Sequence, residues 1–287
     1  MKHGVIISAH NNVEIVRTAL RMLDDPRFIF FLHIDAKSKH HPQEFVPELK
    51  HASCVMLDRV VLNWGGYSMI HVIFRLMEAA VNHQVDVIHY LQGADLPLKT
   101  PDQIDRFLEN NSEKNFLNFQ PECNDYARYK VLCKHFLVEL PWYREAKILH
   151  WINHGLSHLQ KPFMDPHRKL YHGSSLFTIT REFALYVLKQ EPEIRREYRY
   201  SIAGDEVFLH TIFMNSPYVQ TLSEFGNVRL IDWKRREGNS PHTFTMEDHQ
   251  ELAAAIATEH YLFARKFSAY RDLDVVKNIE ALICTDR

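Results

Sequence analysis

Four short runs of apolar residues, separated by segments with helical spacing, constrain the fold of this chain most. Residues 5–9, 28–34, 54–57 and 85–91 are too short for helices and end in polar loops, which favours buried strands. Between them, residues 13–23 and 68–81 repeat apolar side chains every three to four positions, with Ser68 as the expected N-cap. A further helix is expected from Pro101 to Leu108.

This alternation predicts an α/β fold, in which a mostly parallel central sheet is covered by helices on both faces. Polar residues follow three of the predicted strands: His10, Asp35 and the segment 93–95. Because ligands of such sheets bind beyond the carboxyl ends of the strands, these positions are compatible with a nucleotide pocket. Taken alone, the pattern favours the alternative that these polar residues only mark loops.

The second half of the chain has a different pattern of predicted strands and helices. Residues 110–172 are rich in aromatic residues and histidine and show no strand–helix alternation, so we expect an excursion that builds an acceptor side. After it, strands are expected at 173–178 and 228–231, and helices at 182–189, 205–214 and 275–283. We interpret the chain as one domain with three parts, 1–109, 110–172 and 173–287.

Composition narrows the class of protein. The net charge of −2 gives no basic field of the kind that binds nucleic acid. The four cysteines share no metal-binding spacing, so we expect buried free thiols in a reducing compartment. No secretory signal and no apolar run of about 18 residues is visible. These features predict a cytoplasmic protein, peripheral to the inner face of the cell membrane at most.

One segment suggests such a membrane contact. Residues 142–171 carry five basic residues against two acidic ones, together with exposed-type apolar residues such as Trp142 and Trp151. Within this segment His150, His154 and His158 are spaced by four, which places them on one face of a helix. A membrane-surface contact that presents a lipid-linked acceptor is one interpretation, and a helix packed on the core is the other.

Eight sequence blocks, in order, resemble one known family. They are HIDAKS (33–38), VVLNWGGYSMI (60–70), YLQGADLPLKT (90–100), HGSSLFTITREFALYVL (172–188), GDEVFLHT (204–211), NVRLIDW (227–233), SPHTFTMED (240–248) and LFARKF (262–267). The chain resembles the core-2/I-branching β-1,6-N-acetylglucosaminyltransferase family, glycosyltransferase family fourteen, which also includes peptide-O-xylosyltransferases. The resemblance implies a GT-A-like fold and an inverting, metal-independent transfer from a UDP-sugar. The chain looks like a compact, bacterial-type cytosolic member of this family.

The resemblance also implies roles for individual residues. Glu206 corresponds to the family's catalytic base, and Asp205 beside it either orients the base, binds acceptor or caps a helix. The Pro of the family motif is Gly204 here. Arg229 and Lys266 are expected to clamp the diphosphate in place of a metal. The D-x-D sequence at 272–274 is interpreted as a helix start, so no metal site and no cofactor are expected.

Further positions are expected to contact the donor or the acceptor. The expected donor contacts are His10, Asp35, Trp64, Gly65, Ser68, Asp95, Gly173 and Ser174, with core packing of Trp64 and turn formation at Asp95 as alternatives. The expected acceptor contacts are Glu122, Tyr126, Arg128, Asp205 and Trp233, although Trp233 is compatible with packing alone.

The expected reaction forms a β-linkage from a UDP-sugar to a hydroxyl of a glycan or glycolipid, in surface polysaccharide assembly. N-acetylglucosamine is the first candidate sugar, ahead of xylose, galactose and glucose. A non-catalytic glycan- or nucleotide-binding module is an alternative of a different class, and a metal-dependent GT-A transferase is another. The retained Glu206, Arg229 and Lys266 speak against the first, and the lack of a D-x-D motif at a strand end speaks against the second.

Overall fold

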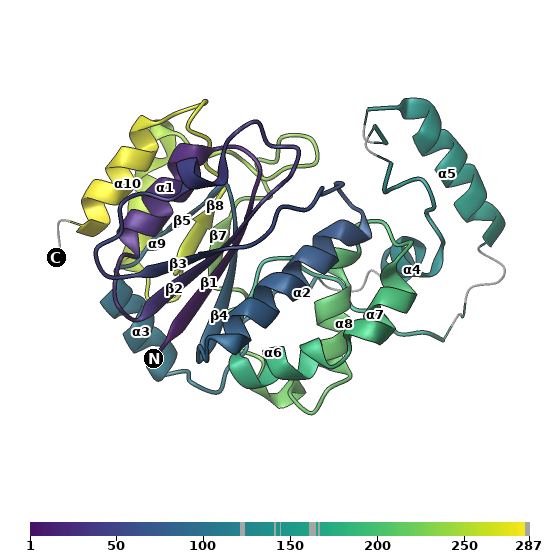
Figure 1. The fold of residues 1–287 in the computed structure, drawn as a ribbon, viewed down its shortest axis with the longest axis horizontal. Coiled ribbons are helices and arrows are strands. Elements are labelled where there is room, and N and C mark those ends of the chain that lie inside the picture. Colours follow the sequence, from purple (N-terminus) through teal and green to yellow (C-terminus); the bar gives the residue numbers. More distant parts are fainter. Residues whose placement is uncertain (121–123, 141, 144, 161–164, 166, 285–287) are drawn as a thin grey trace.

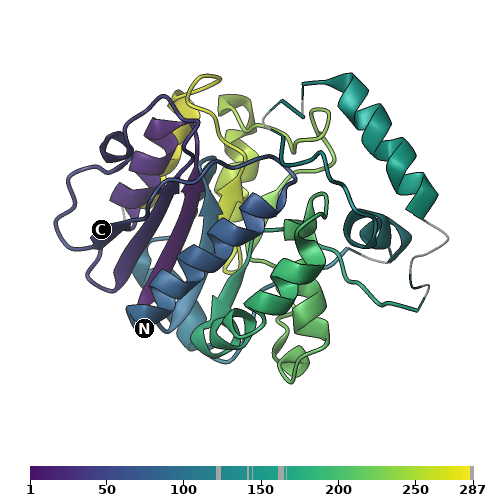
Figure 2. The same ribbon diagram turned by 45° about the vertical axis from the view of Figure 1, so that its right-hand side comes forward.

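A computed structural model of the chain describes all residues except 121–123, 141, 144, 161–164, 166 and 285–287. It shows an α/β fold with a central sheet between two layers of helices, as the sequence predicts (Figure 1). A helical excursion, residues 124–160, projects on the side of the sheet where α2 lies (Figures 1 and 2).

The main sheet has the order β3-β2-β1-β4-β6. Its first four strands are parallel, and the edge strand β6 is antiparallel to β4. The strands are β1 (His3–Ala9), β2 (Phe28–Ile34), β3 (Ser53–Met56), β4 (Val87–Gln92) and β6 (Thr178–Thr180). The parallel register aligns Ala9 of β1 with Ile34 of β2, so the loops that carry His10 and Asp35 leave the same edge.

Alternate residues of the strands face two different cores, because successive side chains of a strand point to opposite faces. Val5 and Ile7 pack with α1 (Val13–Met22) and α3 (Pro101–Glu109), while Ile6 packs with α2 (Tyr67–Asn82) and α6 (Arg181–Leu188). Every residue of β2 is buried, as expected for a parallel strand covered on both faces.

A second, three-stranded sheet lies beside the end of β4. Its order is β5-β8-β7, comprising β5 (Asp95–Pro97), β8 (Phe263–Arg265) and β7 (Arg229–Ile231). It packs under α1, α9 (His249–Ala257) and α10 (Asp274–Cys284) through a third apolar cluster. This sheet brings the last quarter of the chain against the 92–95 turn, where the sequence predicted donor contacts.

The remaining elements are helices and short turns outside the two sheets. They are α4 (Asn124–Leu132), α5 (Lys147–Gln160), α7 (Glu191–Tyr198), α8 (Phe208–Met214), and short 3-10 turns at Pro42–Phe45, Gly204–Glu206 (η3), Val219–Thr221 and Met246–Asp248. The helical segment predicted at 205–214 is therefore η3 followed by α8. The strand predicted at 173–178 is wrong in its bounds, because the strand begins only at Thr178.

Two helix starts test the capping predictions. Helix α2 begins at Tyr67 with Gly66 as its N-cap, so the prediction of Ser68 as N-cap is wrong. The D-x-D segment does begin a helix, since Asp272 Oδ1 accepts hydrogen bonds from the amides of Asp274 and Val275 at 2.9 and 3.2 Å.

Helix α5 is polar toward the protein and apolar toward the outside. Asn153 and Ser157 are buried, and the Nδ2 of Asn153 donates to the hydroxyl of Tyr143 at 3.1 Å. In contrast Ile148, Trp151 and Leu159 are 68%, 78% and 73% exposed. This arrangement is the reverse of an ordinary surface helix, whose apolar stripe faces the core.

Among the described residues, no helix combines the length and the apolar character needed to span a membrane. Cys54, Cys133 and Cys284 are free thiols, and Cys123 lies outside the described residues. Burial raises the pKa of the Cys54 thiol to about 11, so this sulfur is held in its protonated form.

Candidate active site

The side chain of Glu206 lies in a cluster of groups that favour its ionised form. The Nζ of Lys130 donates a hydrogen bond to Glu206 Oε2, and the Nε2 of His172 lies 3.0 Å from the same oxygen. Lys130 and His172 are almost completely buried, whereas the Glu206 side chain is 38% exposed. Burial alone would raise the pKa of Glu206, but the hydrogen bond with His172 and the Lys130 charge outweigh it and lower the pKa.

The neighbouring Asp205 has the opposite environment. Its side chain is buried, and burial together with the charge of Glu206 raises its pKa to about 7, against a smaller opposing effect of Lys130. Two adjacent carboxyl groups are thus driven in opposite directions, one toward the carboxylate and one toward the acid. Such a split is typical of sites that use one carboxylate as a base.

One loop and one helix hold the backbone that leads into η3. The amide of Ala203 donates to the carbonyl of Gly65 at 2.7 Å, and the amide of Ile202 donates to the carbonyl of Lys130 at 2.8 Å. The Trp-Gly-Gly loop and helix α4 are therefore both fixed to the residues just before Glu206. Ala203 has a φ of +50°, a strained value for a residue with a side chain, which is found more often at functional sites than elsewhere.

Gly173 lies directly beside this turn, as the sequence predicted for a residue of the site. Its amide donates to the carbonyl of Glu206 at 2.9 Å. A Cβ at this position would lie 2.0 Å from the carbonyl oxygen of Asn118 and 2.3 Å from Nε2 of His210, so only glycine fits. Ser174 is held by the same backbone ladder, with its amide donating to Asn118 at 3.1 Å. Contacts of either residue with a donor sugar stay predictions.

Asp35 and His10 come together at the ends of β2 and β1. His10 Nδ1 lies 3.5 Å from Asp35 Oδ2, while Asp35 Oδ1 accepts hydrogen bonds from the amides of Lys37 and Leu62 at 2.9 and 3.2 Å. Asp35 is buried and His10 is about half exposed, which leaves the imidazole accessible at the edge of the sheet. The two residues thus lie close together at one edge of the sheet, and their contacts with a donor stay predictions.

Asp95 forms a buried ion pair with Arg265. Its Oδ1 accepts from the Nη1 of Arg265 at 2.6 Å, and its Oδ2 accepts from the amide of Gln92 at 2.7 Å. The amide of Phe267 donates to the carbonyl of Ala94 at 2.9 Å. Residues 265–267 therefore lie against the end of β4, and Lys266, partly buried, is at the edge where His10 and Asp35 emerge. Asp95 holds this segment in place, so the structure gives it a role that differs from the predicted sugar contact.

The structure does not assemble the predicted pair of Arg229 and Lys266. The guanidinium of Arg229 is buried and donates to the carbonyls of Tyr90, Phe177 and Asn227 and to the hydroxyl of Thr178. Arg229 pairs with Phe263 in the sheet register, three residues from Lys266, which separates the two Cα atoms by roughly 10 Å. In this structure the Nη groups of Arg229 are bound to protein acceptors, and its contact with a diphosphate stays a prediction.

The Trp-Gly-Gly loop is fixed by a residue that the sequence did not single out. Glu139 Oε1 accepts from the amide of Ser68 at 2.8 Å, and Oε2 accepts from Nδ2 of Asn63 at 2.9 Å and from the Ser68 hydroxyl at 3.1 Å. Gly66 allows this close approach, because a Cβ there would lie 2.5 Å from Glu139 Oε1 and displace the carboxylate. Trp64 is 48% exposed, which favours a site residue over the core alternative.

The predicted acceptor residues are less completely defined. Glu122 and the side chain of Tyr126 lie outside the described residues. Arg128 donates to Asp125 Oδ1 and to the carbonyl of Arg168, both at 3.1 Å, and Trp233 is 51% exposed in the loop after β7. Their roles at an acceptor stay predictions.

Sequence reasoning missed Lys130, His172, Glu139 and Arg265. Lys130 and Glu139 lie in the segment that shows no regular pattern, whereas His172 is the first residue of the HGSSLFTITREFALYVL block. Arg265 stood inside the LFARKF block next to Lys266, so proximity in sequence was an available signal. Among the described residues, no group of three or more His, Cys, Asp or Glu side chains could hold a metal ion.

Comparison with known proteins identifies the family of the chain. A family model described as Core-2/I-Branching enzyme matches residues 5–255. The chain belongs to the Core-2/I-branching enzyme family. Seven of the eight blocks that carry the resemblance lie inside the matched range, including the block with Asp205 and Glu206, and only LFARKF lies beyond it.

Its curated relatives in the family are xylosyltransferases. The chain is 26% identical over 293 residues to rat xylosyltransferase 2, a match that covers 93% of this chain and 32% of the relative. It is 25% identical over 281 residues to human xylosyltransferase 1, covering 88% of this chain and 27% of the relative. The chain thus spans about a third or less of these relatives' length. A solved structure of mouse xyloside xylosyltransferase 1, apo form, matches with a TM-score of 0.43 and 13% identity, over 92% of this chain and 96% of that one.

Proposed function

We propose that this member of the Core-2/I-branching family is an inverting glycosyltransferase domain. It would move a sugar from a UDP-sugar to a hydroxyl of a glycan or glycolipid acceptor. The observation that carries the proposal is the Glu206 carboxylate, which is partly exposed, held ionised by Lys130 and His172, and placed beside a buried Asp205 of raised pKa. A general base must be deprotonated and within reach of the acceptor hydroxyl, and the Glu206 carboxylate meets the first condition and is accessible for the second.

In the proposed reaction, the acceptor oxygen forms a bond to the anomeric carbon while the bond from that carbon to the diphosphate oxygen breaks. The proton of the acceptor hydroxyl passes to Glu206, and UDP leaves with the bonding electron pair. Attack from the face opposite the leaving group inverts the anomeric configuration. Lys130 and His172 keep Glu206 in place by contacting Oε2, which leaves Oε1 for the hydroxyl.

The donor is proposed to bind along the edge formed by His10, Asp35 and the 265–267 segment. This edge lies at the carboxyl ends of β1, β2 and β4, where parallel sheets bind ligands. Lys266 supplies positive charge there, in the role first assigned to Lys266 and Arg229. Such cations stabilise the charge that develops on a leaving diphosphate, so we propose transfer without a metal ion.

N-acetylglucosamine stays the first candidate for the transferred sugar, as the resemblance to the branching enzymes implies. Xylose is the alternative, because the curated relatives are named xylosyltransferases. A thermal-shift comparison of UDP-N-acetylglucosamine, UDP-xylose, UDP-galactose and UDP-glucose in EDTA would rank them. A rise in Tm that appears only with added manganese would replace the metal-independent proposal by a metal-dependent one.

The variant Glu206→Gln tests the catalytic role directly. It keeps the size of the side chain and removes the base, so transfer should fall by about 10²-fold or more while UDP affinity stays unchanged. The exposed Glu113→Gln is the matched control and should transfer normally. Equal activity of both variants would remove Glu206 from the mechanism, and nucleotide binding without any transfer would favour a non-catalytic binding module.

We further propose that α5 contacts an anionic membrane surface that presents a lipid-linked acceptor. Its outward face carries Ile148, Trp151 and Leu159, and the helix has no acidic residue but one lysine and three histidines. An apolar face flanked by positive charge is the pattern of helices that lie in a membrane interface. The helix is joined to the protein by polar contacts instead, such as the hydrogen bond from Asn153 to Tyr143.

Flotation with liposomes that contain anionic lipid tests this contact. The unaltered chain should float, Trp151→Ser should lose binding, and Lys147→Glu should weaken it. Tyr270→Ser, which removes an equally exposed aromatic residue elsewhere, is the control. No flotation of the unaltered chain would refute the contact, and concentration-dependent dimers abolished by Trp151→Ser would show that α5 joins two copies instead.

A further inference from the structure

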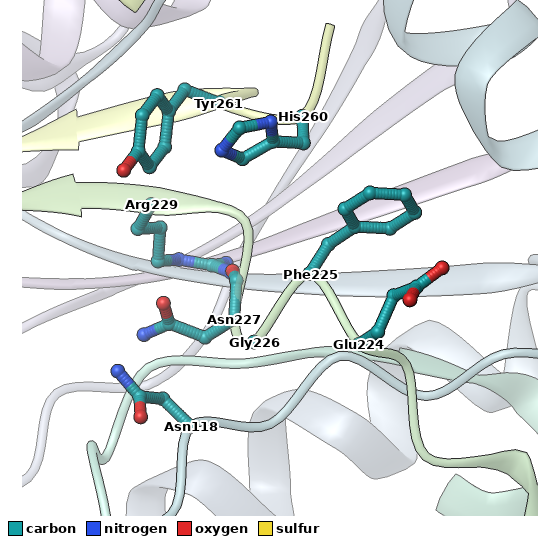
Figure 3. A pocket seen from close by; sticks show the side chains of 8 residues that line it. All are labelled: Asn118, Glu224, Phe225, Gly226, Asn227, Arg229, His260 and Tyr261. Carbon is teal, nitrogen blue, oxygen red and sulfur yellow. The ribbon is translucent and has the colours of Figure 1, made fainter.

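A cavity of about 470 Å³ opens near the start of β7 and β8, and no part of the proposed mechanism uses it. Three separate segments contribute its lining, as Figure 3 shows. The lining residues are Asn118, Glu224, Phe225, Gly226, Asn227, Arg229, His260 and Tyr261. Its volume falls within the range of about 300–1,000 Å³ that is usual for small-molecule sites.

Aromatic rings form one wall of this cavity. The rings of Phe225 and His260 are stacked, with centroids 5.8 Å apart and planes within 17°, and the His260 and Tyr261 centroids are 4.3 Å apart. The amides of Asn118 and Asn227 lie across from them (Figure 3). The cavity therefore offers flat apolar surface on one side and paired donors and acceptors on the other.

The charges of the lining argue against an anionic ligand. Arg229 lies at the floor, but its Nη donors are bound to main-chain carbonyls and the Thr178 hydroxyl. Its Nε is buried and has no hydrogen-bond partner among the described residues. Glu224 is exposed at the rim and would repel a phosphate or carboxylate. A neutral ligand with hydroxyl groups fits these groups better.

The cavity adjoins the backbone that holds the proposed catalytic loop. Asn118 lines the cavity with its side chain, while its carbonyl accepts from the amide of Ser174 at 3.1 Å and lies 3.1 Å from Nε2 of His210. Gly173, next to Ser174, donates to the carbonyl of Glu206. A molecule bound in the cavity is thus close to the reaction without touching the Glu206 carboxylate.

We propose that this cavity is a saccharide-binding subsite for a part of the acceptor glycan remote from the reacting hydroxyl. The proposal rests on the proposed transferase function, because it takes the acceptor to be a glycan. A pyranose ring presents an apolar face to the wall of Phe225, His260 and Tyr261, and its hydroxyls both donate to and accept from the amides of Asn118 and Asn227. Binding there makes the enzyme prefer an oligosaccharide to a single sugar.

Binding of neutral oligosaccharides to the Glu206→Gln variant tests this subsite apart from catalysis. The probes are chito-, xylo-, cello- and galacto-oligosaccharides from di- to hexasaccharide. Their binding is measured by isothermal titration calorimetry. At least one series should bind, with an affinity that rises with length. Asn118→Ala and Tyr261→Ala should each weaken binding by about 10-fold or more. Tyr261→Phe keeps the ring and should retain binding, and the exposed Tyr270→Ala is the control.

The possible outcomes separate this proposal from the transferase function. Binding lost in Asn118→Ala and Tyr261→Ala supports the subsite even if no transfer is ever detected. Binding unaffected by both variants, or absent with every series, overturns it while leaving Glu206 untouched. Competition by inorganic phosphate would also overturn it, because it would show an anion site. Asn118 is exposed, so its variant stays informative if Tyr261→Ala fails to fold.

Discussion

Adjacent residues with opposite surroundings define the candidate site at the scale of single side chains. Asp205 and Glu206 are neighbours in η3, yet Lys130 donates a hydrogen bond to Glu206 and acts on the buried Asp205 only through a smaller effect of its charge. Burial raises the pKa of Asp205 to about 7, so at neutral pH Asp205 is about half protonated while Glu206 is ionised. His172 and Lys130 are the positioning residues that lower the pKa of the base.

The variant Lys130→Met removes this charge while keeping the length of the side chain. The pKa of Glu206 should rise, since burial is then opposed only by His172. As the pH is lowered, transfer should therefore begin to decline at a higher pH than in the unaltered chain. The acid limb of the profile of kcat/KM against pH should shift to higher pH. Lys134→Met, on the same segment but bonded to the carbonyl of Glu197, should leave the profile unchanged. A uniform loss of activity at every pH would mean that Lys130 acts only in folding.

Arg229 and Lys266 should behave differently, although the sequence grouped them. Arg229→Met removes one donor from each of the carbonyls of Tyr90, Phe177 and Asn227, so it should destabilise the fold by about 1–3 kcal/mol in urea unfolding. Lys266→Ala should unfold at nearly the same urea concentration as the unaltered chain but bind UDP more weakly. A stable Arg229→Met variant with weakened UDP binding would restore the original clamp.

The motif at Glu206 could be predicted because a family resemblance attaches a role to a position. The orientation of Arg229 could not, because nothing in NVRLIDW shows whether its side chain faces solvent or the space between two sheets. That choice depends on the carbonyls of Tyr90 and Phe177, which lie 139 and 52 positions away in the chain. Lys130 and Glu139 were missed for the same reason, because their partners Glu206 and Ser68 lie 76 and 71 positions away in the chain.

At the scale of elements, strands and helices with a strong periodic pattern were predicted to within two residues. β2 has the predicted bounds, and α2 and α10 differ by one residue at each end. The second sheet was largely missed, because β5 and β8 have only three residues each and too few positions to show alternation. The missed sheet carries Arg265, so the donor edge could not be completed from the sequence.

The connection between Glu139 and the start of α2 gives a prediction for an element. Glu139→Ala removes the acceptor of the Ser68 amide and of the Asn63 side chain, so it should lower the free energy of unfolding by about 1–3 kcal/mol. Because Gly65 also holds the amide of Ala203, kcat should fall as well. Glu139→Gln keeps one acceptor oxygen and should restore part of both losses.

The exposed Glu145→Ala is the matched control for this loop, and both its stability and its kcat should be normal. If Glu139→Ala lowers stability but leaves kcat and KM unchanged, Glu139 is a structural cap without a positioning role. If neither changes, the loop is held by other contacts of residues 63–68.

At the scale of the whole molecule, buried histidines make stability depend on pH. Burial lowers the pKa of His33 to about 4, although the nearby Asp35 opposes it, and burial together with the His172 charge lowers that of His210 to about 3. In the unfolded chain both protonate near 6.5. Between pH 6.5 and 4 the unfolded state therefore binds more protons, and each group lowers stability by about 1.4 kcal/mol per pH unit as the pH falls.

Asp205 has the opposite effect, which supplies an internal control. Its pKa is raised to about 7, so the folded state holds a proton between pH 7 and 4 that the unfolded state lacks, and stability rises as the pH falls. Asp205 thereby offsets the contribution of one histidine, and Tm should still drop as the pH falls from 6.5 to 5, because several buried histidines act in the other direction. Asp205→Asn removes this compensation, so its Tm should fall more steeply. Parallel Tm profiles of the two proteins would mean that Asp205 is ionised in the folded state.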